Sequence, residues 1–502
     1  MTLKTNELDI GEALVGLATP DRMESPLKPK RLTLLVIVSF LIITGLLLFT
    51  FYLQILKGGH YQALARNNQV ETSPLKAPRG TIYGKYFKTL AENVNYEDKT
   101  VRFYNYPMAS AHLVGYIDTE GNGKTGLESY YNDYLKGKDG FTQTEYSSSG
   151  GEERLISRKE AEIGKSLLLH IDSDLQNKVY ELLPDDKKSA VVILDPKTGG
   201  ILSLVSKPSF NNNLFSESIS PEEYARIIEN PQKPLFNRAV NGQYPPGSIW
   251  KIFLAAAALE EKVFDPYRKQ DTPVRLTIPN KYDPDVVYIF PDWKDHGSID
   301  MFDALRQSSN VYFYNIGELL GWKDFRKYAL EFGFGEVSGL DLSNEAEGFI
   351  PGKGWLGDLY HSSIGQGNVK VTPLQIAMAT GAISSGKVYE PQLVDKITDE
   401  DNSTIKDFLP NVLNSNFIGE ENLELVRKGM NSSAWQVPGL DTRILGKTGT
   451  AQFAPNSETY HTWFTSLTDD LVVTVLVEEG KSGSGTALPI AKSIYKWYYS
   501  RK

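Results

Sequence analysis

The chain of 502 residues contains no cysteine and only six histidines. Without thiols it can form no disulfide bond, no cysteine-ligated zinc site and no cysteine nucleophile. The histidines are scattered, and none of them stands in an HExxH or similar metal-binding spacing. We therefore expect no metal ion and no cofactor, and a fold whose stability comes from packing.

Positive charge is also scarce. The formal net charge is −9, and no long segment is dominated by lysine and arginine. Nucleic-acid-binding proteins present a basic surface to the phosphates, so we expect no nucleic-acid partner. Gly123-Lys124-Thr125 and Gly446-Lys447-Thr448 imitate the end of a phosphate-binding loop. Asp118 and Asp441 stand where that motif needs its first glycine, which argues against nucleotide binding.

One long apolar run, residues 32–56, carries no charge. It exceeds the roughly 20 residues that span a bilayer, and it is longer than the apolar core of a cleavable signal peptide. Lys28, Lys30 and Arg31 crowd its N-terminal side, and such a bias favours a cytoplasmic location for that side. We predict an uncleaved, single-pass anchor in the cell membrane, with the rest of the chain extracytoplasmic.

The chain is too long for one ordinary domain. We divide it into a cytoplasmic tail (1–31), the anchor (32–56), a short N-terminal pedestal or linker domain (57–164) and a larger C-terminal domain (165–502). Strand and helix patterns alternate in the C-terminal domain. Predicted strands cover 166–172, 190–194, 201–206, 444–453, 460–467 and 471–478, and predicted helices cover 174–183 and 488–498.

Three short strings in the C-terminal domain combine the groups that acyl transfer by a serine requires. They are Ser248-Ile249-Trp250-Lys251, Ser308-Ser309-Asn310 and Lys447-Thr448-Gly449-Thr450. A serine hydroxyl is a poor nucleophile until a base takes its proton, and Lys251 lies one helical turn from Ser248. Lys251 can be that base only when it is neutral. Burial in an apolar helix and the nearby charge of Lys447 would both lower its pKa.

Context distinguishes Ser248 from chance matches. The same serine–lysine spacing recurs at Ser25/Lys28, Ser73/Lys76, Ser384/Lys387, Ser403/Lys406 and Ser493/Lys496. Ser248 differs because it follows the turn-forming run Tyr244-Pro245-Pro246-Gly247 and precedes a nearly continuous apolar helix, residues 249–259. It therefore lies at a helix N-terminus, where backbone N–H groups and the helix dipole favour developing negative charge.

Each string also has a plainer interpretation. Lys251 could extend to solvent along its helix. Ser308-Ser309-Asn310 could be a cap or a turn, and the segment containing Lys447 could be an ordinary surface strand. The presence of all three strings in one chain favours the catalytic interpretation.

The order of the three strings resembles that of penicillin-binding proteins and serine β-lactamases. Other stretches resemble class B penicillin-binding proteins in particular. They are Ala77-Pro78-Arg79-Gly80 before Ile82-Tyr83, Gly126-Leu127-Glu128, Asp195-Pro196-Lys197-Thr198-Gly199, Phe236-Asn237-Arg238-Ala239, Gly365-Gln366-Gly367 and Thr372-Pro373-Leu374-Gln375. The resemblance runs from about residue 57 to the C-terminus. It implies a mixed α/β (α+β) transpeptidase domain over 165–502, with an antiparallel five-stranded sheet flanked by helices, on a short pedestal.

The resemblance also implies a role for each reacting group. Ser248 attacks the D-Ala-D-Ala bond of a peptidoglycan stem peptide, and Lys251 is its base. Ser308 passes a proton between Lys251, Lys447 and the leaving amine, while Asn310 hydrogen-bonds the substrate peptide.

The strand of the third string is expected to bind the substrate. The hydroxyls of Thr448 and Thr450 can bind a terminal carboxylate beside the charge of Lys447. Gly449 leaves room for another backbone to approach, as peptide addition to a sheet edge requires. We expect the backbone N–H groups of Ser248 and Thr450 to form the oxyanion hole.

The implied function is that of a peptidoglycan D,D-transpeptidase, which cross-links stem peptides through a serine acyl-enzyme and is acylated by β-lactams. One alternative is a D,D-carboxypeptidase, in which water replaces the acceptor amine. Another is a catalytically silent β-lactam-binding scaffold or sensor in a wall-synthesis complex. A β-lactamase is disfavoured, because an anchor and a pedestal serve little purpose there. The implied partners are the membrane, D-Ala-D-Ala stem peptides, β-lactams and a membrane glycan polymerase.

Several nearby residues are expected to have packing roles. Gly365-Gln366-Gly367 shapes a tight loop, and Tyr460, Trp463 and Phe464 pack in the sheet. His461 is expected on a strand surface, since lysines already fill the role of base. Pro78-Arg79-Gly80 is expected to form a corner at the start of a domain. The pedestal lacks the long insertion expected near residues 91–102.

Overall fold

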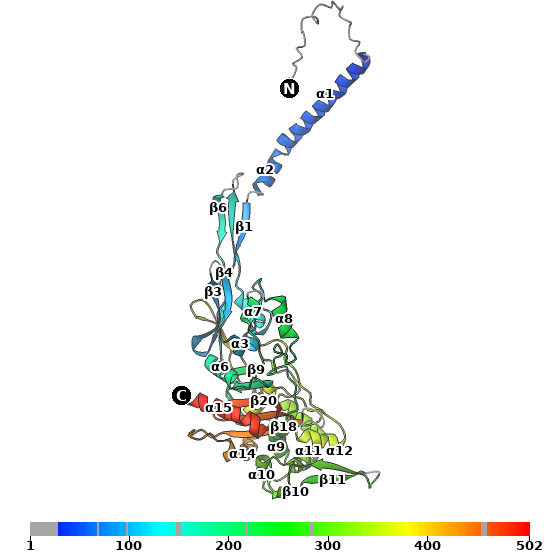
Figure 1. The fold of residues 1–502 in the computed structure, drawn as a ribbon, viewed down its shortest axis with the longest axis vertical. Helices are drawn as coiled ribbons and strands as arrows, with labels where there is room; N and C mark the ends of the chain where they lie inside the picture. Colours follow the sequence, from blue (N-terminus) through cyan, green and yellow to red (C-terminus); the bar gives the residue numbers. More distant parts are fainter. Residues whose placement is uncertain are drawn as a thin grey trace, which may run out of the picture. The chain divides into compact units, whose positions relative to one another are not determined.

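The computed structural model describes residues 29–67, 70–96, 99–146, 152–216, 219–280, 283, 285–452 and 459–501 (Figure 1). Most of the predicted cytoplasmic tail, residues 1–28, lies outside the described part. The chain forms two compact units, one of residues 1–74 with 141–159 and one of residues 75–140 with 160–502.

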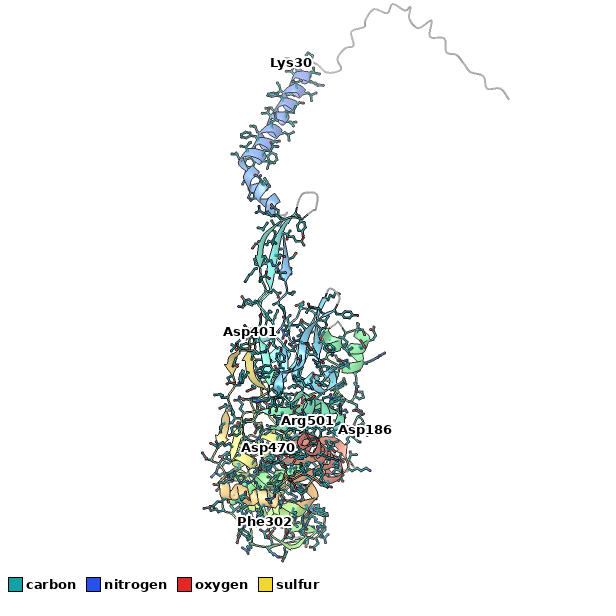
Figure 2. The ribbon with its side chains drawn as sticks, turned by 90° about the vertical axis from the view of Figure 1, so that its left-hand side faces the viewer. Lys30, Asp186, Phe302, Asp401, Asp470 and Arg501 are labelled. Atoms are coloured by element: carbon teal, nitrogen blue, oxygen red, sulfur yellow. The ribbon has the colours of Figure 1, made fainter. Side chains whose placement is uncertain are left out.

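The first unit contains the apolar helix. Helix α1 (Pro29–Phe51) continues through a wider turn, η1 (Tyr52–Leu56), and none of its residues is buried by protein. Figure 2 shows its side chains projecting on all sides of the helix. Thr33 and Thr50 donate their hydroxyls to the carbonyls of Pro29 and Leu46, so their polar groups are satisfied within the helix. By length and composition, Pro29–Leu56 is a helix able to cross a membrane once.

The rest of the first unit is small. Helix α2 (Gly58–Asn67) follows the apolar helix. A three-stranded sheet has the order β1-β5-β6, formed by Val70–Leu75, Gly140–Tyr146 and Glu152–Lys159.

The second unit is built around a five-stranded antiparallel sheet of order β18-β19-β20-β8-β9. The strands are β18 (Leu445–Gln452), β19 (Tyr460–Leu467), β20 (Val472–Gly480), β8 (Ser189–Leu194) and β9 (Ile201–Lys207). The predicted five-stranded sheet is confirmed, and its predicted strand limits differ from these by at most two residues.

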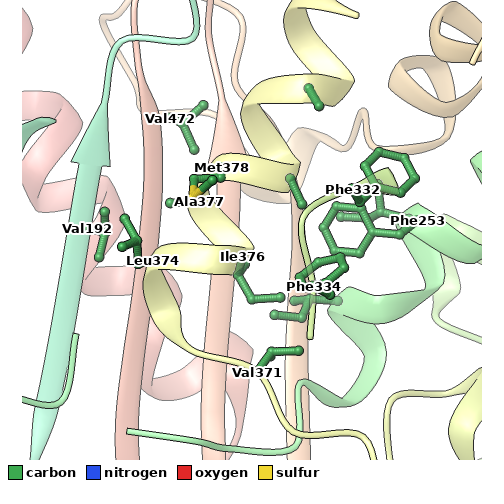
Figure 3. Close-up of a cluster of buried hydrophobic side chains, with 14 of the residues drawn as sticks. Val192, Phe253, Phe332, Phe334, Val371, Leu374, Ile376, Ala377, Met378 and Val472 are labelled. Carbon is green, nitrogen blue, oxygen red and sulfur yellow. The ribbon is translucent and has the colours of Figure 1, made fainter. Parts of the chain in front are cut away.

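Both faces of this sheet are buried, because alternate residues of each strand enter different cores. Val192 and Val472 belong to one apolar cluster, whereas Val191 and Val473 belong to the other. Helix α13 (Pro373–Ser385) packs on the first face, and helices α6 (Ser173–Leu182) and α15 (Leu488–Tyr499) pack on the second. Figure 3 shows Leu374, Ala377 and Met378 of α13 in the first cluster, together with Phe253, Phe332 and Phe334.

Helix α13 begins at the string Thr372-Pro373-Leu374-Gln375, which forms a reciprocal cap. The Thr372 hydroxyl accepts from the Gln375 N–H at 3.1 Å, and the Gln375 side-chain oxygen accepts from the Thr372 N–H at 3.0 Å. Pro373 occupies the first helical position, where no N–H is needed. The string therefore has a structural role: it starts the helix that covers the sheet.

A second sheet has six strands in the order β16-β15-β7-β2-β3-β4. They are β16 (Thr404–Asp407), β15 (Val394–Thr398), β7 (Ser166–Leu169), β2 (Ile82–Gly84), β3 (Lys88–Tyr96) and β4 (Lys99–Tyr104). Strand β7, at the start of the predicted catalytic domain, pairs in parallel with β2 of the predicted pedestal. This sheet therefore runs across the predicted boundary at residue 164.

The other short strands and the other helices surround the two sheets. Three strand pairs are β10 (Gln270–Thr272) with β13 (Gly297–Ile299), β11 (Arg275–Pro279) with β12 (Val287–Pro291), and β14 (Lys387–Tyr389) with β17 (Val412–Ser415). The helices include α3 (Pro107–Val114), α4 (Gly126–Tyr130), α5 (Asn132–Leu135), α7 (Asn213–Ser216), α8 (Pro221–Ile228), α9 (Trp250–Glu260), α10 (Met301–Gln307), α11 (Asn310–Glu331), α12 (Leu356–Ser363) and α14 (Glu420–Gly429). Single turns are η2 (Lys85–Phe87), η3 (Gly247–Ile249), η4 (Ser433–Trp435) and η5 (Gly483–Ala487).

A buried ionic cluster joins two strings of the pedestal region. The Glu128 carboxylate is fully buried and accepts from Arg79 Nε at 2.5 Å and from Arg102 Nε at 2.8 Å. Arg79 also donates to the Glu128 and Gly121 carbonyls. The run Pro78-Arg79-Gly80 is thus more than the expected corner: its arginine ties the segment before strand β2 to helix α4. Glu128 of that helix also binds Arg102 of strand β4.

Removing the charge of Glu128 should destabilise the chain. In Glu128→Gln, two buried guanidinium groups lose their shared anion, and breaking a buried ion pair on one side costs about 3–5 kcal/mol. We expect a loss of that size in chemical unfolding of the detergent-solubilised full chain. Glu120→Gln, which removes an exposed carboxylate nearby, should have almost no effect. Equal stability of the two variants would contradict this account of the cluster.

Candidate active site

Ser248 lies in the single turn η3, directly before the buried helix α9. It is partly exposed, while its neighbours Gly247 and Ile249 are buried. Gly247 has φ +58°, a left-handed conformation that suits glycine, and this turns the chain into the helix. Among the residues that the structure describes, none forms a hydrogen bond with the Ser248 hydroxyl, which leaves its oxygen open to a substrate.

The turn before Ser248 is held from several sides. The Trp463 indole donates to the Pro245 carbonyl at 3.0 Å, and the Gly247 N–H donates to the Gly365 carbonyl at 2.8 Å. Tyr244 exchanges two backbone hydrogen bonds with Val371, of 2.9 and 3.0 Å. These contacts fix the position of Ser248 relative to the sheet. They give the Gly365-Gln366-Gly367 loop the structural role expected from the sequence.

Lys251 is fully buried in α9 and contacts the second string. Its Nζ donates to the Ser308 carbonyl at 2.8 Å and to Asn310 Oδ1 at 2.7 Å, and it lies 3.5 Å from Ser308 Oγ. Burial lowers the pKa of Lys251 well below its usual value, and the charge of Lys447 lowers it further, while Asp292 acts in the opposite sense. The interpretation of Lys251 as a lysine extending to solvent is therefore wrong.

The second string joins two helices. Ser308 ends α10 in a left-handed conformation (φ +62°), and Ser309 caps α11 by accepting from the Tyr312 N–H at 3.3 Å. The capping interpretation is thus correct for Ser309. Ser308 and Asn310, on either side of that cap, present their polar groups to Lys251.

Lys447 comes from strand β18 and reaches the same hydroxyl. Its Nζ donates to Ser308 Oγ at 2.8 Å and to the Thr448 carbonyl at 3.1 Å, and the residue is 2 % exposed. Burial lowers the pKa of Lys447 to about 7. The Ser308 hydroxyl therefore lies between two lysine amines that the protein has removed from water.

The end of the third string lies beside the turn that carries Ser248. A Cβ at Gly247 would be 3.0 Å from the Thr450 carbonyl oxygen, so these two backbones are in contact. The Thr450 hydroxyl accepts from the Gly483 N–H at 3.2 Å. That bond leaves the hydroxyl hydrogen of Thr450 free to be donated.

Gly449 lies in close contact with the turn before Ser248. A Cβ there would lie 2.8 Å from the Pro246 carbonyl oxygen and 3.1 Å from Ile249 Cγ2. The backbone that approaches Gly449 in the structure is thus that of the turn before Ser248. The glycine lets strand β18 and this turn pack closely.

Sequence reasoning missed Asp292, whose side chain contacts the second string. Its carboxylate is buried and accepts from Ser309 Oγ at 2.7 Å and from the Val311 N–H at 2.9 Å. His296 Nε2 lies 3.4 Å from the same carboxylate. Asp292 precedes Ser309 by 17 positions, and no periodic pattern relates the two residues in the sequence.

His461 is not on a strand surface as expected. It is 7 % exposed, and its ring meets that of Tyr244 edge-on, with centroids 5.0 Å apart. Burial lowers its pKa. The packing roles of Trp463 and Phe464 are confirmed, since both are buried in the sheet.

Comparison with known proteins identifies two regions of the chain. Residues 189–496 match the model of the penicillin-binding protein transpeptidase domain, and residues 91–169 match that of the penicillin-binding protein dimerisation domain. The peptidoglycan D,D-transpeptidase MrdA of Haemophilus influenzae is 30% identical to this chain, over 94% of the chain and 92% of the relative. That alignment runs over 607 positions, more than the 502 residues here, so the relative has segments that this chain lacks.

Solved structures agree with this match. Pseudomonas aeruginosa PBP2 in complex with WCK 5153 has a TM-score of 0.73 and 28% identity, covering 85% of this chain and 96% of that one. The D,D-transpeptidase domain of a peptidoglycan glycosyltransferase from Eggerthella lenta has a TM-score of 0.69 and 26% identity, covering 84% and 98%. PBP2 of Helicobacter pylori in complex with MreC shares the fold, with a TM-score of 0.71 and 24% identity over 86% and 99%.

The Gly449 contact gives a test of the site geometry. In Gly449→Ala the new Cβ pushes against the Pro246 carbonyl and displaces Ser248, and displacements of about 1 Å can cost about 100-fold in rate. We expect a loss of that size in the rate of labelling by fluorescent penicillin, with the chain still folded by circular dichroism.

Gly381→Ala is the matched control for this variant. Gly381 is also buried, but its new Cβ would meet Leu194 Cδ1 at 3.5 Å, an ordinary contact. Its labelling rate should stay at the wild-type value. A Gly449→Ala chain that is labelled as fast as Gly381→Ala would show that the close approach has no bearing on the reaction.

Proposed function

Because this chain belongs to the penicillin-binding protein transpeptidase family, we propose that it cross-links peptidoglycan stem peptides through an acyl-enzyme on Ser248. The observation that carries this proposal is the position of the Ser308 hydroxyl between the amines of Lys251 and Lys447. Ser248 is three residues before Lys251, in the turn η3 that leads directly into the helix of Lys251. Lys251, one helical turn from the partly exposed Ser248, thus contacts a group that can relay and return a proton.

Lys251 is the base in this proposal. A neutral amine has two N–H donors and one lone pair, and the two short bonds to Ser308 O and Asn310 Oδ1 use both donors. The lone pair is then left to accept the proton of Ser248. The low pKa of Lys251 supports this role, since only the neutral amine can accept a proton.

The acyl transfer has two stages, acylation of Ser248 by the donor peptide and deacylation by the acceptor amine. Ser248 Oγ forms a bond to the carbonyl carbon of the penultimate D-Ala while its proton moves to Lys251. The carbon–nitrogen bond then breaks, and the D-Ala amine leaves with a proton relayed through Ser308. An acceptor amine from a neighbouring stem attacks the ester next, gives up its proton along the same route, and restores the Ser248 hydroxyl.

Substrate binding is assigned to strand β18. Lys447 supplies positive charge, and the hydroxyls of Thr448 and Thr450 donate to the terminal carboxylate of the donor peptide. Gly449 keeps this strand against the turn of Ser248. The backbone N–H groups of Ser248 and Thr450 form the oxyanion hole, and Asn310 binds the peptide backbone of the substrate.

The remaining assignments concern location and partners. The helix Pro29–Leu56 is a single-pass anchor in the cell membrane, with the catalytic domain (165–502) and the short pedestal (57–164) outside the cytoplasm. Since the pedestal region matches a dimerisation domain, we assign it to protein contacts. The partner proposed is a membrane glycan polymerase of the wall-synthesis machinery, and β-lactams are covalent inhibitors.

Covalent labelling tests the nucleophile. Full-length chain in detergent, incubated with fluorescent penicillin, should carry one adduct on the peptide containing Ser248, identified by mass spectrometry. Ser248→Ala should lose the label, because the attacking oxygen is gone. Ser403→Ala, at a chance serine–lysine spacing in an exposed segment, should be labelled like wild type. A label that survives in Ser248→Ala would refute the assignment.

Replacing Lys251 and replacing Thr450 should slow acylation to different extents. Lys251→Ala removes the base, and loss of general-base catalysis typically costs about 10²–10⁴-fold in rate. Thr450→Ala removes one hydroxyl donor to a carboxylate and should slow acylation by about 10- to 100-fold. Stopped-time labelling with fluorescent penicillin measures both rates. Undiminished acylation of Lys251→Ala would rule that lysine out as the base.

A further inference from the structure

Asp292 is a buried charge beside the candidate active site that the mechanism above does not use. It follows strand β12 directly, and its side chain is shielded from solvent. A carboxylate without water is costly unless hydrogen bonds and opposite charges compensate for the lost hydration. The donors and charges around Asp292 therefore indicate the role of its carboxylate.

Three hydrogen bonds tie Asp292 to the second string and its own loop. Oδ2 accepts from Ser309 Oγ at 2.7 Å and from the Val311 N–H at 2.9 Å, and Oδ1 accepts from the Trp293 N–H at 2.8 Å. Val311 is in the first turn of α11, where the helix dipole favours an anion. Asp292 thus fixes the start of α11.

The residues that flank Ser309 are the ones that contact Lys251. Ser308 adopts a left-handed conformation (φ +62°), which a non-glycine residue keeps only when its surroundings impose it. The bond from Ser309 to Asp292 is one such restraint. It holds the Ser308 carbonyl and the Asn310 amide at the distances that let both accept from the Lys251 amine.

Charge adds a second effect. Lys251 is fully buried, and the charged group that acts with burial to weaken its basicity is Lys447. Asp292 is the group of opposite sign that acts on Lys251, and it raises its pKa. An amine whose pKa is lowered too far accepts a proton poorly. An anion that opposes the lowering of the Lys251 pKa therefore favours proton transfer to that amine.

We propose that Asp292 is a positioning residue for acylation at Ser248: by accepting from Ser309 and Val311, its carboxylate holds the Ser308–Asn310 segment against Lys251. Its negative charge is a second influence on the same amine. This inference rests on the proposed function. The two effects are separable, because the restraint acts through Ser309 and the charge acts directly on Lys251.

The test is the pH dependence of the acylation rate constant, measured with fluorescent penicillin on the full chain in detergent. Acylation needs neutral Lys251, so the rate rises with pH through the pKa of that amine. In Asp292→Asn the side-chain oxygen can still accept from Ser309 and Val311. The charge is lost, and an NH2 group replaces Oδ1, the atom that accepts from the Trp293 N–H and faces His296 Nε2 at 3.4 Å. The pKa of Lys251 then falls, and the acid limb of the profile should move to lower pH.

Ser309→Ala separates the restraint from the charge. It removes the hydrogen bond and keeps the carboxylate, so the acid limb should stay in place while the plateau rate falls by about tenfold. Asp295→Asn is the control, since it removes an exposed carboxylate from the same loop. Its profile should superpose on that of wild type. Circular dichroism checks that each variant is folded.

If the pH profile of Asp292→Asn rises over the same pH range as that of wild type, the charge of Asp292 has no effect on Lys251. An unchanged plateau in Ser309→Ala would overturn the restraint. Both results leave the proposed function intact as long as the label is on Ser248. Loss of that assignment would instead appear as labelling of the Ser248→Ala chain, so the two failures can be told apart.

Discussion

The site depends on the burial of two lysine amines against one serine hydroxyl. Water would keep both amines charged, and charged they would repel each other across Ser308. Helix α9 and strand β18 bring Lys251 and Lys447 to that hydroxyl, and both lysines are buried. Under these conditions an amine can be a base near neutral pH, so the packing of the domain supplies the condition that the proposed mechanism requires.

The frame that holds these amines is rigid where the reaction needs it. Ser248 lies in the turn that leads into helix α9, Ser308 caps the end of helix α10, and Lys447 lies within strand β18, so each group is held at an element or directly at its end. The close approach of Gly449 to Pro246 couples the strand to the turn that carries Ser248. Helix α13 supports the arrangement from the face of the central sheet.

Much of this could be predicted from the sequence. Strands β8 and β20 of the central sheet have nearly continuous apolar runs because both faces of the sheet are covered, and the apolar helix α9 follows directly from its composition. Other features could not be predicted. Asp292, the burial of His461, and the shared anion of Arg79 and Arg102 all involve residues that lie far apart in the chain and share no periodicity.

The sequence by itself determined the chemical inventory: a hydroxyl, two lysines and a cationic strand in recognisable local contexts, and an apolar helix long enough for a membrane. Local spacing is sufficient for these features, because helices and strands have fixed periods. Only the tertiary structure decided which groups meet. Lys251 and Lys447 reach Ser308 across 57 and 139 positions of chain, and contacts at such separations depend on how whole elements pack.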